Sequence, residues 1–167
     1  MSKSKQGADR EWKAKVLALL GQNHVMSVAT VRPDGWPQVT MVGFVNDGLV
    51  LYFAVARNSQ KLANIKRDPR ISIAIGGDSL TRIRGLSMAA RATAVSDAEE
   101  AKRLDILIGE RYPERWVFAP RDDTPVILRA TPQIISLIDL DKDSGHPELL
   151  EVITETAVRA ASGPTRH

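Results

Sequence analysis

The chain has 167 residues, which suits a single domain, and its 43% hydrophobic and 26% charged residues are ordinary for a soluble globular protein. Lys and Arg exceed Asp and Glu by 23 − 20 = 3, so the composition excludes a histone-like polycation despite a pI of about 9.4. The absence of cysteine excludes disulfides, thiolate nucleophiles and cysteine zinc sites, and the polar start without a long apolar run predicts a cytoplasmic protein with no membrane contact.

The N-terminal part predicts a short tail followed by a helix. Residues 1–9 are polar and predict a disordered segment. Apolar residues then recur at helical spacing from Trp12 to Leu20, which predicts a helix over 10–20 that Gly21 ends.

After this helix the pattern changes to β-branched and aromatic residues. Turn signals at 32–35 and 46–48 separate three runs, which predicts an antiparallel meander. In the third run both alternating sets of side chains are apolar, so one face should line a barrel interior. The other face should lie under a helix, a partner subunit or a flat ligand. The expected strands span residues 24–31, 36–45, 49–55, 70–75, 81–95, 126–130 and 134–140.

Three further helices are expected. One spans 58–68 and ends before Pro69, one spans 96–111 behind a capping box, and one spans 148–160 after Pro147. The fold class is therefore α+β, an antiparallel six- to seven-stranded split β-barrel with flanking helices. The barrel domain should occupy 10–145, and 146–167 should form a C-terminal helix and tail.

The most unusual local feature is basic. The segment from Arg57 to Lys61 joins a strand to a helix, where the partial positive charge of the helix start normally favours acids. Arg57, the Ser59 hydroxyl, Lys61 and free backbone N–H groups could converge there on a phosphate. The alternative is a solvated basic turn capped by Asn58 or Ser59. Neither a metal-ligand pattern nor an obvious catalytic residue accompanies it, so no metal is expected and the catalytic residues stay unassigned.

One block of the sequence is similar to a known family. Residues 27–75 contain the hairpin ATVRPDGWPQ and the block LYFAVARNSQKLANIKRDPRIS, in that order. This run resembles the pyridoxamine 5'-phosphate oxidase-like, FMN-binding split β-barrel family, and a weaker likeness extends to about residue 140. The resemblance implies FMN as cofactor and a homodimer with the flavin at its interface.

The resemblance also implies a set of cofactor-binding positions. These positions lie on the second expected strand, at the end of the third, at the phosphate-binding corner and at a position that the other subunit supplies. They are Val39, Thr40, Met41 and Val42; Ala54 and Val55; Arg57, Ser59, Gln60 and Lys61; and Arg84. Gln60 stands where the family has arginine, and Arg57 could replace that cation. Gly85 lacks the polar side chain often found there.

The function implied is an FMN-dependent oxidoreductase that exchanges a hydride with a small-molecule substrate, with Tyr112, Trp116 and Phe118 as candidates for the substrate wall. The C-terminal segment lacks the Arg-Leu-His-type motif that holds pyridoxal phosphate, so pyridoxamine phosphate oxidation itself is not expected. The alternatives are a non-catalytic flavin-binding or sensor protein, or a relative that uses a deazaflavin coenzyme or haem. A nucleic-acid-binding barrel is disfavoured, because aromatics are only 5% and no basic stripe interleaves with them.

Overall fold

The computed structural model describes residues 5–76, 83–114, 125–140, 148–154 and 157–160. Its helices are α1 (Lys5–Gln22), α2 (Gln60–Arg67) and α3 (Ala98–Arg111). Its strands are β1 (Val25–Val31), β2 (Pro37–Gly43), β3 (Val45–Asp47), β4 (Val50–Val55), β5 (Arg70–Gly76), β6 (Ile83–Ala94), β7 (Val126–Leu140), β8 (Glu148–Thr154) and β9 (Ala157–Ala160). None of the helices in this part of the chain is long and apolar enough to cross a membrane.

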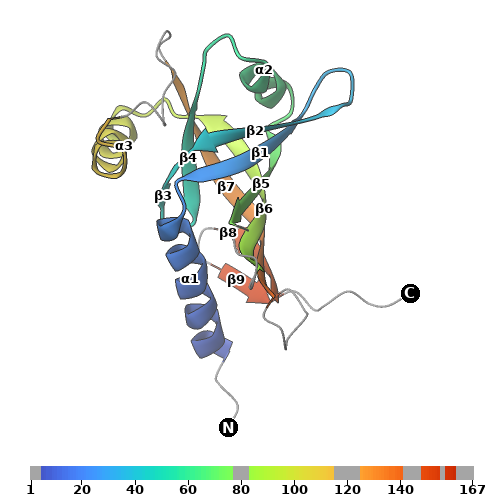
Figure 1. The fold of residues 1–167 in the computed structure, drawn as a ribbon, viewed down its shortest axis with the longest axis vertical. Coiled ribbons are helices and arrows are strands. Elements are labelled where there is room, and N and C mark those ends of the chain that lie inside the picture. Colours follow the sequence, from blue (N-terminus) through green and yellow to red (C-terminus); the bar gives the residue numbers. More distant parts are fainter. Residues whose placement is uncertain (1–4, 77–82, 115–124, 141–147, 155–156, 161–167) are drawn as a thin grey trace.

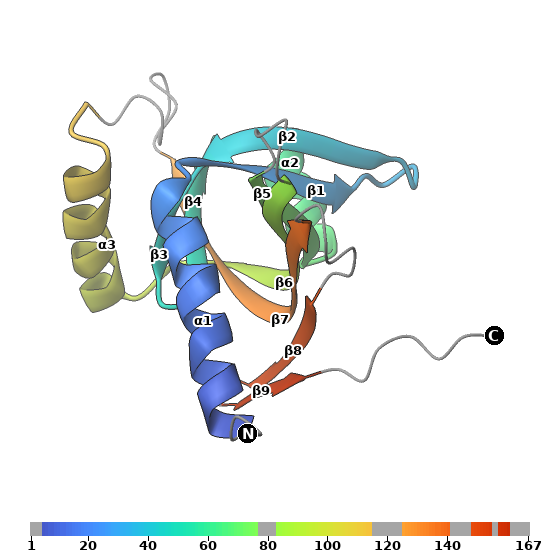
Figure 2. The ribbon, with the colours of Figure 1, turned by 60° about the horizontal axis from the view of Figure 1, so that its bottom comes forward.

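The strands form one curled antiparallel sheet, as Figures 1 and 2 show. Seven of them follow the order β2-β1-β5-β6-β7-β4-β3, and β8 and β9 extend from β7. The α+β split-barrel class predicted from the sequence is therefore confirmed. Helix α3 lies outside the barrel, whereas α2 lies beside β1 and β2.

The predicted three-stranded meander is wrong. The second expected strand breaks at Phe44, so that β2 pairs with β1 at one edge of the sheet and β3 pairs with β4 at the other. Phe44 is fully buried, and its backbone N–H bonds to the carbonyl of His24 and to the hydroxyl of Tyr112. A buried anchor at this point redirects the chain from one edge of the barrel to the other.

The ends of the chain also differ from expectation. Residues 148–154 and 157–160 are strands β8 and β9, not the predicted C-terminal helix. The pairing of β7 explains why this segment is a strand. Strand β4 pairs with the first half of β7 only, so the second half, from Ile134 to Leu137, has a free edge with which β8 pairs. At the other end α1 begins at Lys5, within the segment expected to be a tail.

The hydrophobic core fills the barrel and extends under two of the helices. Inward-facing residues of β1, β4, β5, β6 and β7 meet Trp12, Val16 and Leu20 of α1 and Leu62 and Ile65 of α2. A second cluster lies on the outer face of β3 and β4, under α3. The doubly apolar strand predicted from the sequence is thus explained by the barrel interior on one side and α3 on the other.

Tyr112, which caps the C-terminal end of α3, ties that helix to the barrel. Its hydroxyl lies 3.1 Å from the N–H of Phe44, 2.7 Å from the Phe44 carbonyl and 2.6 Å from the His24 carbonyl. The preceding Arg111 donates to the Leu20 carbonyl at the end of α1, at 2.9 Å. These contacts hold α1, α3 and the break between β2 and β3 together.

We expect Tyr112→Phe to lower the free energy of unfolding by about 1–2 kcal/mol, because a buried hydroxyl and its hydrogen bonds are lost. Urea denaturation followed by circular dichroism measures this effect. Ile106→Val on the same helix is the control, because Ile106 is exposed and the substitution removes only a methylene that packs against little. It should change the free energy of unfolding by less than about 0.5 kcal/mol. Equal effects of the two substitutions would contradict the anchoring role of the hydroxyl.

Candidate functional site

The site begins where β4 passes into α2. Ser59 is the N-cap of α2, with an extended backbone (φ −73°, ψ 146°), and its hydroxyl oxygen accepts the N–H of Leu62 at 3.2 Å. The first turn of α2 contains no acidic residue. Of the two caps considered from the sequence, Ser59 is the one observed, and the helix start stays free of negative charge.

A buried amide fixes α2 against the hairpin of β1 and β2. The Asn64 side chain, which is fully buried, donates to the Thr30 hydroxyl at 2.9 Å and to the Gln38 side-chain oxygen at 3.1 Å. Its own oxygen accepts the Gln60 amide at 2.9 Å. Sequence reasoning missed Asn64, Thr30 and Gln38, because only the tertiary fold brings the three together.

Lys61 lies one helical turn before Asn64, on the same side of α2, and is only 9% exposed. Burial lowers the pKa of its ammonium to about 8, and no carboxylate in the described part of the chain forms an ion pair with it. A buried, unpaired cation is costly unless an anion joins it.

Thr40 presents a second unsatisfied group. Its side-chain oxygen is buried without a hydrogen-bond partner, and it lies two residues beyond Gln38, on the same face of β2. Gln38, on that face of β2, bonds to Asn64, on the side of α2 that also carries Lys61. A donor-rich, positively charged corner of this kind has the chemistry to bind a phosphate.

The other strand residues predicted to contact a flavin are divided between surface and core. Val39 and Met41 are 62% and 73% exposed on the outer face of β2, while Val42 is partly buried against the core. Val55 packs into the barrel core and Ala54 packs under α3, so neither side chain faces an open surface.

Arg84 lies far from α2 within one chain. It is near the start of β6, whereas α2 leads into β5 beside Arg91, at the other end of the ladder of β5 and β6. Seven residues of strand separate Arg84 from Arg91, which is about 24 Å. Its neighbour Gly85 faces Gly76 across the ladder, and a Cβ atom on Gly85 would lie 2.8 Å from the Ile75 carbonyl oxygen, so the close backbone approach explains the missing side chain.

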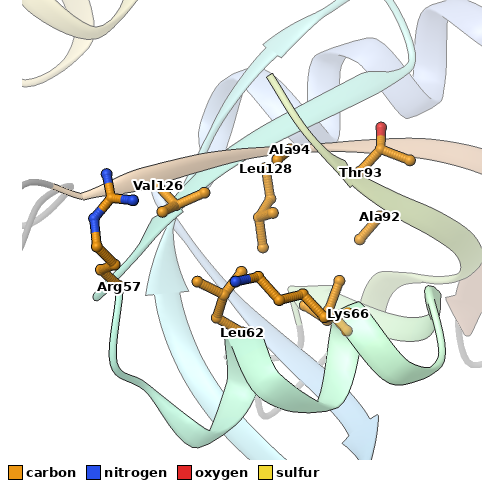
Figure 3. Close-up of a pocket in the computed structure, with 9 residues that line it drawn as sticks. Arg57, Leu62, Lys66, Ala92, Thr93, Ala94, Val126 and Leu128 are labelled. Carbon is orange, nitrogen blue, oxygen red and sulfur yellow. The ribbon is translucent and has the colours of Figure 1, made fainter. Parts of the chain in front are cut away.

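Arg57 also departs from the predicted phosphate set. It lines a pocket between α2 and strands β6 and β7 together with Lys66, as Figure 3 shows, and neither Gln60 nor Lys61 lines that pocket. Of the three aromatic residues expected at a substrate wall, Trp116 and Phe118 lie outside the described residues. Tyr112 is instead buried at the end of α3, with its hydroxyl against the His24 and Phe44 carbonyls. Within the described part of the chain no group of His, Asp and Glu side chains is arranged to hold a metal ion.

The curled antiparallel sheet with its flanking helices is the architecture of the split β-barrel proteins. The chain belongs to the pyridoxamine 5'-phosphate oxidase family, whose model matches residues 12–139.

Three similar proteins are named. General stress protein 26 of Bacillus subtilis (strain 168) is 28% identical over 133 residues, which are 76% of this chain and 88% of that protein. The pyridoxine/pyridoxamine 5'-phosphate oxidase of Rhodopseudomonas palustris (strain BisB5) is 37% identical over 84 residues, but these are 47% of this chain and only 39% of that enzyme. A solved structure named F420 reductase is 32% identical, with a TM-score of 0.56 over 71% of this chain and 94% of that one.

Proposed function

We propose that this protein is a cytoplasmic, homodimeric flavoprotein that binds FMN and catalyses a redox reaction of a small molecule. The observation that carries the proposal is the buried Lys61, which has no ion pair among the described residues. The Thr40 hydroxyl, buried without a partner on the face of β2 that contacts α2 through Gln38, supports it. Two of the similar proteins are named as an oxidase and a reductase, which supports a redox role.

The residues present fit a flavin phosphate. Lys61 would supply the cation, the open first turn of α2 would supply N–H donors, and the hydroxyl of Thr40 would gain a partner. The Ser59 oxygen already accepts the Leu62 N–H, so its own proton is free to be donated to the phosphate. Arg57 is left out of this set because it lies in the other pocket.

The flavin supplies the hydride chemistry when bound, so the protein has to bind and orient it and exclude competing reactions. The exposed apolar side chains of Val39 and Met41 on edge strand β2 would lie against the ring and the second subunit. Trp36, just before β2, is 72% exposed and is a further apolar side chain on the surface of this hairpin. An edge strand with such side chains is typical of an interface, and light scattering of the purified protein should report a dimer.

A spectrum of the purified protein, followed by titration with FMN and with a deazaflavin coenzyme, tests the proposal. We expect saturable FMN binding with one flavin per subunit. The similarity to F420 reductase favours the deazaflavin as the second candidate, and tighter binding of that coenzyme would replace FMN in the proposal. Rapid mixing of the flavin complex with a reduced nicotinamide cofactor then separates an oxidoreductase from a non-catalytic flavin binder, in which the flavin stays oxidised.

The affinity for FMN should depend on pH through Lys61. Because the pKa of the free ammonium is about 8, half of it has lost its charge at that pH, and binding a phosphate must take up a proton at higher pH. We expect affinity to be constant near pH 7 and to fall by up to tenfold per pH unit above about 8. Fluorescence quenching of FMN between pH 6.5 and 9.5 measures this, and Lys61→Met should abolish the slope.

A further inference from the structure

A second pocket lies on the side of α2 that faces away from β1 and β2. It has a volume of about 390 Å³ and is lined by residues from the end of β4, from α2, and from the adjoining parts of β6 and β7: Arg57, Leu62, Ile65, Lys66, Ala92, Thr93, Ala94, Val126 and Leu128 (Figure 3). Its lining includes neither Lys61 nor Asn64 and no residue of β1 or β2, so the pocket is distinct from the candidate phosphate site.

The lining is apolar at the base and positively charged at the rim. Leu62, Ile65 and Leu128 are buried side chains of the barrel core that form part of the wall. Arg57 and Lys66 are both exposed, and in Figure 3 the Lys66 side chain extends over α2 towards Leu62, on the side where Arg57 stands. No carboxylate lines the pocket, and in the described part of the chain neither cation has an ion pair or a side-chain hydrogen bond.

We propose that this pocket binds a small apolar monocarboxylate, with the hydrocarbon or aromatic body against Leu62, Val126 and Leu128 and the carboxylate between Arg57 and Lys66. The charge pattern selects this chemistry: an apolar wall favours a hydrocarbon body, and two cations in the lining, without ion pairs among the described residues, favour an anionic head group. A doubly charged or fully polar anion would leave the wall uncovered, and a neutral hydrocarbon would leave both cations unused. The carboxylate is a candidate substrate or effector whose binding does not depend on the flavin.

The test is a calorimetric titration of the full-length protein with octanoate and, as its neutral counterpart, 1-octanol. We expect saturable binding of octanoate at one site per subunit, at least tenfold tighter than that of octanol. Arg57→Gln and Lys66→Gln should each weaken octanoate binding by about five- to tenfold, because each removes one charge-assisted contact. Arg67→Gln, an exposed position on the same helix outside the pocket, is the matched control and should leave the affinity unchanged.

A second variant tests the pocket itself. Ala94 lines the pocket but is exposed, so Ala94→Leu can fill the space without disturbing the core, and it should abolish octanoate binding while both cations remain. Equal affinity for octanol and octanoate, or octanoate binding that Ala94→Leu leaves intact, would overturn the proposal. So would displacement of octanoate by FMN, because the pocket would then belong to the flavin site.

Discussion

Lys61→Met should weaken FMN binding by about 10- to 100-fold while leaving the fold intact. A charge-assisted hydrogen bond from an ammonium to a phosphate contributes about 1.5–3 kcal/mol, and methionine keeps the volume of the lysine stem without its charge. Lys61 has no anionic partner among the described residues, so the substitution removes no ion pair from the free protein. Titration of FMN fluorescence gives the affinity, and thermal unfolding of the flavin-free protein gives the stability.

Two variants sharpen this result. Lys61→Glu places a carboxylate beside the phosphate and should weaken binding further, by repulsion as well as by loss of the cation. Lys66→Met makes the same change on the same helix at an exposed position outside the candidate phosphate site, and should leave FMN affinity unchanged. If Lys61→Met binds FMN as tightly as the unaltered protein, the phosphate site lies elsewhere.

The pH dependence of the stability of the flavin-free protein independently tests the burial of Lys61. The pKa of Lys61 lies below its ordinary value of 10.5, so between about pH 8 and 10.5 the unfolded chain binds more protons than the folded one. The contribution of this residue to stability therefore rises with pH across that window. Lys61→Met should remove this contribution to the pH dependence and should be at least as stable as the unaltered protein at pH 7.

Glu100→Ala should destabilise the protein by about 2 kcal/mol, although it lies far from the candidate phosphate site. Glu100 accepts the Tyr52 hydroxyl at 2.9 Å and both ends of the Arg129 guanidinium, at 2.9 Å from Nε, and its side chain is 10% exposed. It therefore joins α3 to β4 and β7. Alanine would leave the Tyr52 hydroxyl and the Arg129 guanidinium without their partner, which costs more than the loss of an exposed ion pair. Denaturant unfolding at pH 7 measures the difference.

Glu99→Ala is the matched control, because Glu99 lies in the same first turn of α3 but forms an exposed ion pair with Lys102. That substitution should cost less than about 0.5 kcal/mol. The Arg129 guanidinium and the other contacts hold the pKa of Glu100 below its ordinary value of 4.5. Its stabilising effect is therefore present above that pH and is lost as the pH falls through the lower pKa of the folded state. Equal losses in the two variants would show that Glu100 acts only through the helix start.

Much of the candidate site could be predicted from the sequence, because local signals converge there. The run from Arg57 to Lys61 combines a strand end, a Ser59 cap and a helix start without acids, and those features depend on neighbouring residues alone. The partners of Asn64 could not be predicted, because Thr30 and Gln38 lie 34 and 26 residues away in the chain and only folding brings them together.

The sequence by itself determined where most strands and helices form, since alternating and helical spacing of apolar residues and the turn residues act over short distances. Tertiary structure decided what these elements pair with. It broke the second predicted strand at the buried Phe44, and it drew 148–154 into a strand because β7 offered an unpaired edge, which outweighs local helix preference. It also placed Arg57 at a pocket that Lys61 does not line, because Arg57 lies before the Ser59 cap whereas Lys61 is buried in the first turn of α2. Strand pairing and the position of the chain break depend on buried contacts and free strand edges between distant segments. These contacts cannot be predicted from a local pattern of residues.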